Sequence, residues 1–227
     1  GRVMNAENDI KICISPRQGK ITIEEQEGLV TTRKEIDRQA LLSCFKNSLR
    51  TEDPGYSSGF LPLNCLSVWQ GREGKRFVLW HPKLYADMTL YDTPYSHFPI
   101  PRMVFRFSTN AEGKVSDCRI GVVADETPTP DTVMYHYPFS NVSEGSGHLC
   151  VGANTMPTYK KLHKAVNLPA FLLSIPNNMY SYYKTHNKLG LEYRDLMEFL
   201  KDKEPSFYYS DVLIPNEWTL GRFIEAM

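Results

Sequence analysis

The residue best suited to chemistry in this sequence is Cys150, which lies in a polar stretch, residues 138–157, that contains several glycines. A thiolate is a strong nucleophile, and a thioester formed on it stays reactive toward amines, so a cysteine makes a good acyl carrier. Asn141 precedes this cysteine by nine positions. Its amide can donate a hydrogen bond to an oxyanion at such a thioester, or it can stiffen the loop that presents the thiol. The pattern predicts that any chemistry of this chain is carried by Cys150.

Two histidines are candidates for a supporting role at this thiol. His148 stands two residues before Cys150, and a neighbouring imidazole can lower a thiol's pKa. The two side chains share a face only where the segment is regularly extended, and the alternative is a solvated loop histidine. His186 lies near the end of a predicted helix, from which it either approaches the site or caps the helix.

The other four cysteines are interpreted as packed residues. Cys13, Cys65 and Cys118 lie in strand-like segments, and Cys44 lies on the apolar stripe of a predicted helix. Cysteines in such places are usually buried, so Cys150 is expected to be the exposed thiol. An odd number of cysteines without C-x-x-C spacing favours free thiols and speaks against a disulfide framework or a zinc site. Free thiols in a reducing cytosol fit this set best.

Composition restricts the class of protein. Hydrophobic residues make up 41% of the 227 residues and charged residues 23%, close to the globular average. Lys and Arg together number 26, as do Asp and Glu, so no net charge favours direct binding to nucleic acid. Apolar runs are too short to span a membrane, and the polar start lacks the layout of a secretion signal. A cytoplasmic protein is expected.

The hydrophobic pattern predicts strands first and helices last, which is an α+β fold. Within residues 1–55, alternating isoleucines indicate a hairpin over residues 10–24. Thr32 and Glu35 have the spacing of a capping box, which predicts a helix over residues 32–49.

Residues 56–227 are expected to form the core with its C-terminal helices. Together with residues 1–55 they are expected to make one compact domain. Connections at residues 70–75 and 109–113 are too short to join parallel strands, so we expect an antiparallel meander of about four strands. The individual segments predicted here are strands at residues 61–69, 76–81, 86–91, 102–108, 114–124 and 132–137, and helices at residues 169–183 and 191–203.

The cysteine loop resembles the active site of the ubiquitin-conjugating enzymes, whose motif is His-Pro-Asn, a short glycine-containing loop, a hydrophobic residue and the catalytic cysteine. Ser140-Asn141-Val142 and Gly147-His148-Leu149-Cys150 occupy those places here. Phe139-Ser140 replaces His-Pro, and the interval from asparagine to cysteine is one residue longer. The order of elements agrees as well: helix, meander, cysteine loop, helices. The resemblance therefore implies a ubiquitin-conjugating-like core over residues 56–227.

The chain is more specifically similar to the prokaryotic branch named PRTRC system protein B, over residues 66–80, 98–107, 138–152 and 182–187. This resemblance implies a bacterial enzyme that accepts a ubiquitin-like protein as a thioester on Cys150 from a ThiF-type adenylating enzyme. The acyl group would then pass to a target, with Asn141 assisting at the oxyanion. The resemblance implies no metal and no organic cofactor on this chain, because the activating enzyme consumes the ATP, and it implies no membrane partner.

Two other functions stay open at this point. A degenerate member of the family would keep the fold as a scaffold that binds a ubiquitin-like protein or a maintenance protein of a mobile element. A cysteine hydrolase would need a histidine brought to Cys150 by folding, because no hydrolase motif flanks that residue.

Overall fold

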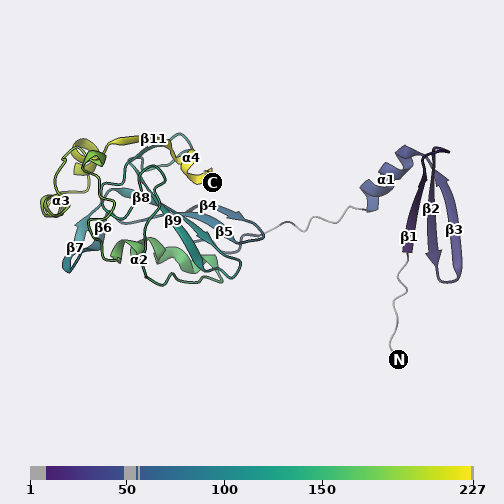
Figure 1. The fold of residues 1–227 in the computed structure, drawn as a ribbon, viewed down its shortest axis with the longest axis horizontal. Helices are drawn as coiled ribbons and strands as arrows, with labels where there is room; N and C mark the ends of the chain where they lie inside the picture. Colours follow the sequence, from purple (N-terminus) through teal and green to yellow (C-terminus); the bar gives the residue numbers. More distant parts are fainter. Residues whose placement is uncertain (1–8, 49–54, 56, 226–227) are drawn as a thin grey trace, which may run out of the picture. The chain divides into compact units, whose positions relative to one another are not determined.

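The computed structural model describes residues 9–48, 55 and 57–225. The chain divides into two compact units, Gly1–Ser57 and Ser58–Met227 (Figure 1).

The N-terminal unit contains a three-stranded antiparallel sheet, followed by helix α1 (Arg38–Ser48). Its strands are β1 (Asp9–Ser15), β2 (Lys20–Glu27) and β3 (Val30–Ile36). Pairing of β1 with β2 confirms the predicted hairpin. The helix prediction was wrong over residues 32–36, which belong to β3. The β-branched residues of that segment suit a strand, and the helix is capped instead by Asp37, whose Oδ1 accepts a hydrogen bond from the Ala40 N–H at 2.7 Å.

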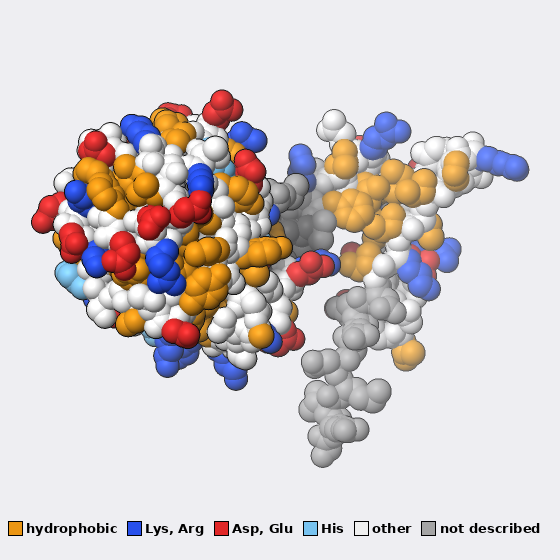
Figure 2. Space-filling model, turned by 60° about the vertical axis from the view of Figure 1, so that its left-hand side comes forward, with side chains coloured by type: hydrophobic (Ala, Val, Ile, Leu, Met, Phe, Trp, Pro, Cys, Tyr) orange, Lys and Arg blue, Asp and Glu red, His pale blue; other side chains and the backbone are white. Residues whose placement is uncertain are grey.

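One face of this small sheet is apolar. Ile12 pairs with Ile23 and Ile14 with Ile21, so these isoleucines share a face, and Ile36 joins them opposite Ile21. Figure 2 shows apolar side chains gathered on this unit. Cys13 alternates with these isoleucines along β1 and therefore lies on the other face of the sheet.

The second unit is built on a six-stranded sheet in the order β11-β10-β9-β8-β5-β4, and its pairings are antiparallel. This confirms the antiparallel meander, although the sheet is larger than the four strands expected. Its strands are β4 (Cys65–Gln70), β5 (Lys75–Trp80), β8 (Arg102–Thr109), β9 (Val115–Val123), β10 (Val133–Tyr135) and β11 (Pro215–Thr219). A separate hairpin is formed by β6 (Tyr85–Leu90) and β7 (Thr93–Pro99).

Alternation along the strands gives the sheet two covered faces. Met103, Phe105 and Phe107 of β8 belong to the main core, whereas Val104 belongs to a smaller core on the opposite face. Helices α2 (Leu168–Ser174) and α3 (Tyr193–Leu200) contribute to the main core, and α4 (Leu220–Glu225) contributes to the smaller one. The unit is therefore a mixed α and β structure with a curled antiparallel sheet and few helices (Figure 1).

The helix predicted over residues 169–183 was wrong beyond residue 174. Ile175 is extended, with ψ of 129°, because Pro176 disfavours helical backbone at the residue before it. The helix predicted over residues 191–203 is present but shorter, because α3 spans Tyr193–Leu200. The remaining helical turns are η1 (Leu162–Asn167), η2 (Lys184–His186) and η3 (Tyr208–Val212).

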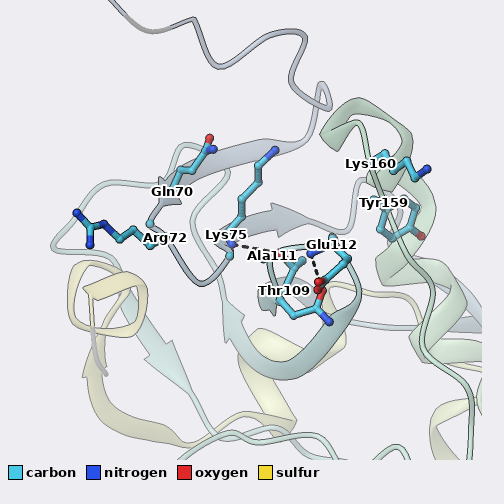
Figure 3. Close-up of a pocket in the computed structure, with 12 residues that line it drawn as sticks. Gln70, Arg72, Lys75, Thr109, Ala111, Glu112, Tyr159 and Lys160 are labelled. Carbon is cyan, nitrogen blue, oxygen red and sulfur yellow. Dashed lines mark hydrogen bonds between the residues drawn. The ribbon is translucent and has the colours of Figure 1, made fainter.

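The two short connections of the meander lie against one another and line a polar hollow of about 290 Å³ (Figure 3). The Lys75 N–H donates to Thr109 Oγ1 at 3.1 Å. Gly74 has a φ of +152°, and a Cβ there would lie 1.8 Å from the Thr109 carbonyl oxygen. The two hairpin ends are thus joined at a point that only glycine can occupy.

Candidate active site

The segment from Asn141 to Cys150 forms a loop closed by backbone hydrogen bonds. The Cys150 N–H donates to the Asn141 carbonyl at 2.8 Å, and the Ser143 N–H donates to the His148 carbonyl at 2.9 Å. Gly145 and Gly147 have φ values of +81° and +68°, a conformation that glycine adopts without steric cost. The glycines thus allow the chain to reverse and return Cys150 beside Asn141.

The returning half of the loop pairs with β9. The Ile120 N–H donates to the Gly147 carbonyl at 2.8 Å, and the Leu149 N–H donates to the Cys118 carbonyl at 2.9 Å. Leu149 is buried in the main core, whereas His148 and Cys150 on either side of it are exposed. Alternation in this extended segment therefore places the imidazole and the thiol on the same face.

A pocket of about 260 Å³ contains both of these side chains, together with Asp117, Met156 and neighbouring residues of β9 and the loop. His148 Nδ1 lies 2.6 Å from Asp117 Oδ1. Asp117 Oδ2 lies 3.8 Å from Arg119 Nε. Since Nδ1 faces the carboxylate, the Nε2 atom of His148 is the ring nitrogen left for other partners.

Asn141 is buried and has a φ of +66°. Its Nδ2 donates to Asn177 Oδ1 at 3.3 Å. Asn177 is itself fixed to the β6–β7 hairpin, because its N–H donates to the Thr89 carbonyl at 2.7 Å and its carbonyl accepts from the Tyr91 N–H at 2.8 Å. These contacts join the start of the loop to the β6–β7 hairpin.

His186 lies in η2, not near the end of the longer helix expected there. It is buried, and its Nε2 lies 3.4 Å from Glu144 Oε1 of the loop. The ring stacks on His136 with centroids 4.1 Å apart. These residues line a separate pocket of about 60 Å³, which does not include Cys150. His186 therefore contacts the outer turn of the loop, and the pocket of the thiol contains His148 instead.

The stacked histidines are expected to make the stability of the chain depend on pH. Burial lowers the pKa of His136 below its ordinary value of 6.5, and the nearby His186 lowers it further. Folding thus favours neutral His136, so its contribution to stability is complete above about pH 6.5 and is lost as the pH falls below that value. We expect the melting temperature to fall below pH 6.5 in wild type and to fall less steeply in His136→Phe, which keeps the stacked ring. Calorimetry across this range checks the difference, with exposed His163→Gln as the control; equal slopes for wild type and His136→Phe would contradict it.

The cysteines differ in exposure, as predicted for some and not for others. Cys150 is exposed, Cys65 is half-buried and Cys118 is buried, and burial raises the pKa of the Cys118 thiol well above its ordinary value. The prediction was wrong for Cys13, which is exposed because it lies on the polar face of β1. The side chain of Cys44 lies outside the described residues.

Sequence reasoning missed Asp117 and Asn177. Both act across the fold, from β9 and from a segment after α2, so their distance from Cys150 in the sequence concealed them. The one available sign was an acidic residue within the otherwise largely apolar strand Val115–Val123. The described residues include no group of three or more His, Cys, Asp or Glu side chains arranged to hold a metal ion.

Comparison with known protein families shows to which family the chain belongs. A family model described as prokaryotic E2 family D matches residues 42–215. The chain belongs to this family. The matched region of this E2-like chain runs from α1 to the first residue of β11 and includes the loop that presents Cys150. The antiparallel sheet and few helices are compatible with an E2-like fold.

No curated protein and no solved structure matches the chain. Membership of the family relates the chain to ubiquitin-like conjugation, and relates it in general to ubiquitin-like partners and their activating enzymes. Within the described part of the chain, no helix combines the length and the apolar character needed to cross a bilayer.

Proposed function

We propose that this protein is a conjugating enzyme that carries a ubiquitin-like protein as a thioester on Cys150. The observation that supports this most is the placement of the thiol. Cys150 is exposed on a loop fixed to β9 and to the β6–β7 hairpin, in the same pocket as the His148–Asp117 pair. A carrier thiol must meet two large protein partners in turn, and an exposed thiol on a loop held by backbone hydrogen bonds meets that requirement.

The proposed reaction has two exchanges. The Cys150 sulfur attacks the thioester carbonyl on a ThiF-type adenylating enzyme, so that one C–S bond forms as another breaks and the donor thiol is released. A nucleophile of the target then attacks the new thioester and releases the Cys150 thiol. ATP is consumed by the activating enzyme, and no cofactor is required on this chain. The PRTRC system is the proposed source of these bacterial, cytoplasmic partners.

The supporting residues have different proposed parts. His148 receives or delivers a proton near the thiol, since its Nε2 is not held by Asp117. His186 fixes the outer turn of the loop through Glu144. The contacts of Asn141 favour the second of its two expected roles, in which its amide braces the loop and does not face the oxyanion.

Mass spectrometry tests the proposal. The full chain is incubated with the adenylating enzyme, a ubiquitin-like protein and ATP, and intact mass is measured with and without reductant. A reducible adduct located to the Cys150 peptide is expected. Stable binding of the ubiquitin-like protein without any adduct would contradict the enzyme function and indicate a non-catalytic scaffold.

Asn141→Ala is expected to lower the melting temperature and to impair loading and discharge together. The substitution removes a buried hydrogen bond, which contributes about 0.5–1.5 kcal/mol, and places a Cβ-bearing residue without a local hydrogen bond at positive φ, which costs roughly 1–2 kcal/mol. Asn141→Gly removes the amide without the backbone strain, so its melting temperature should lie between those of wild type and Asn141→Ala. Single-turnover loading and discharge are measured beside thermal melting.

Asn177→Ala is the matched control for this bracing role. It removes the partner of the Asn141 amide and leaves Asn141 unchanged, so it should reproduce the kinetic effect of Asn141→Gly. If Asn141→Gly loads normally while its discharge falls by roughly 10²- to 10³-fold, and Asn177→Ala discharges normally, the amide acts at the oxyanion instead.

A further inference from the structure

The pair formed by His148 and Asp117 has the arrangement of a general base held by a carboxylate. The 2.6 Å contact joins Nδ1 to Oδ1, which fixes the ring. In a neutral imidazole held in this way, Nδ1 donates to the carboxylate and Nε2 is the nitrogen that can accept a proton. The same pocket contains the Cys150 side chain. In hydrolases this kind of dyad removes a proton from a hydroxyl as the hydroxyl attacks a carbonyl.

Access to the dyad is open. The side chain of His148 is 47% exposed and that of Asp117 is 33% exposed, so an acceptor from another protein can approach the imidazole. The base is therefore open to an incoming acceptor in the same pocket that contains the thiol, and it is not sealed inside the core.

The charges around the thiol are less suited to a lysine acceptor. Asp117 is the one carboxylate among the described residues that line this pocket. It already contacts His148, and Arg119 Nε lies 3.8 Å from its second oxygen. Among these described residues, the pocket thus lacks a free anion that would attract an ammonium group.

We infer that Asp117 and His148 direct the Cys150 thioester toward a hydroxyl-bearing acceptor, a Ser or Thr side chain; this inference rests on the proposed carrier function. The acceptor Oγ attacks the thioester carbonyl carbon, a C–O bond forms and the C–S bond breaks. The hydroxyl proton passes to His148 Nε2 and then to the Cys150 thiolate. The products are an oxyester and the free thiol, and no oxidant or further reactant is needed.

The chemical reason lies in the difference between hydroxyl and amine. A hydroxyl is a weak nucleophile until a base removes its proton as the bond forms, whereas a neutral amine attacks without a base. His148 is therefore the general base of the transfer, and Asp117 is a positioning residue that holds its ring.

Chemical loading makes the test independent of the natural partners. The full chain with Cys13→Ser is loaded at Cys150 by exchange with a fluorescent peptide bearing a mercaptoethanesulfonate thioester, and loading is verified on the Cys150 peptide. Discharge of the adduct is then timed with two acetylated tripeptide amides that differ only at the central residue, threonine or lysine. Failure of Cys150 to load would count against the carrier function itself, whereas the inference concerns only discharge.

Transfer to the threonine peptide should fall by about 10²-fold in His148→Gln and by at least about 10-fold in Asp117→Asn, because the amide no longer holds the correct ring tautomer. Transfer to the lysine peptide should stay within about twofold, since a neutral amine needs no base. Added imidazole should restore transfer to threonine in His148→Ala but not in Asp117→Asn.

His163→Gln and Asp92→Asn, which make the same chemical changes at exposed positions, serve as controls and should leave both rates unchanged. Equal losses toward threonine and lysine, or transfer to threonine that does not depend on His148, would overturn the inference.

Discussion

Cys150→Ala is expected to abolish the reducible adduct with the ubiquitin-like protein completely. The thiol is the point of covalent attachment, and an alanine offers no atom to which the acyl group can bind. Because Cys150 is exposed, the substitution removes few packing contacts. The free energy of unfolding should therefore change by no more than about 0.5 kcal/mol, as is usual for surface substitutions, and the melting temperature should stay nearly the same. Loss of the adduct with an unchanged melting temperature is therefore the expected pair of results.

Cys13→Ala is the matched control, because Cys13 is the other thiol that the structure describes as exposed. It should leave the adduct intact. Intact mass with and without reductant, followed by peptide mapping, distinguishes the two. An adduct that persists in Cys150→Ala and disappears in Cys13→Ala would show that the carrier thiol is Cys13, in the N-terminal unit.

Phe139→Ala should have the largest effect on stability, a loss of about 3–5 kcal/mol. Phe139 is 1% exposed, and its ring makes edge contacts with Phe98, Tyr137 and Tyr208, with centroids 5.3–6.1 Å apart. Removing the ring leaves a cavity in the main core directly before Ser140 and Asn141. We expect the loop to lose its support, so loading at Cys150 should fall along with the stability.

Chemical denaturation measures this effect, and Phe60→Ala is the control because Phe60 is 87% exposed. The control should stay within about 0.5 kcal/mol of wild type. If Phe139→Leu, which refills most of the cavity, regains both stability and loading, the ring acts through packing. A normal unfolding midpoint for Phe139→Ala would refute the role of this side chain as the support of the loop.

The meander and the cysteine loop were accessible to sequence reasoning because their causes are local. Short connections force antiparallel neighbours, and glycines beside a cysteine mark an irregular loop. The predicted ends of helices and strands were wrong where one local sequence pattern competed with another. Thr32 and Glu35 fit a capping box, but the same residues alternate across β3 and pair with β2, so tertiary pairing prevailed.

The candidate site was predictable only in part, for a related reason. Cys150, Asn141 and His148 lie within one short stretch, so their proximity was visible in the chain itself. Asp117 reaches His148 because the loop pairs with β9, and Asn177 reaches Asn141 because its backbone is bonded to the β6–β7 hairpin. Contacts of this kind depend on register between distant segments, and no pattern within either segment specifies that register.

The pairing of the cysteine loop with β9 also affects how the chain avoids self-association. A strand edge with free N–H and C=O groups is a template for another chain. Along β9, residues 122 and 123 pair with β10, residues 118–120 are bonded by the loop, and Val115 N–H donates to the Pro157 carbonyl. A loop that opened widely would uncover the middle of this edge. The segment that presents the thiol therefore also protects the sheet against aggregation, and this favours a loop that stays closed while its partners come to it.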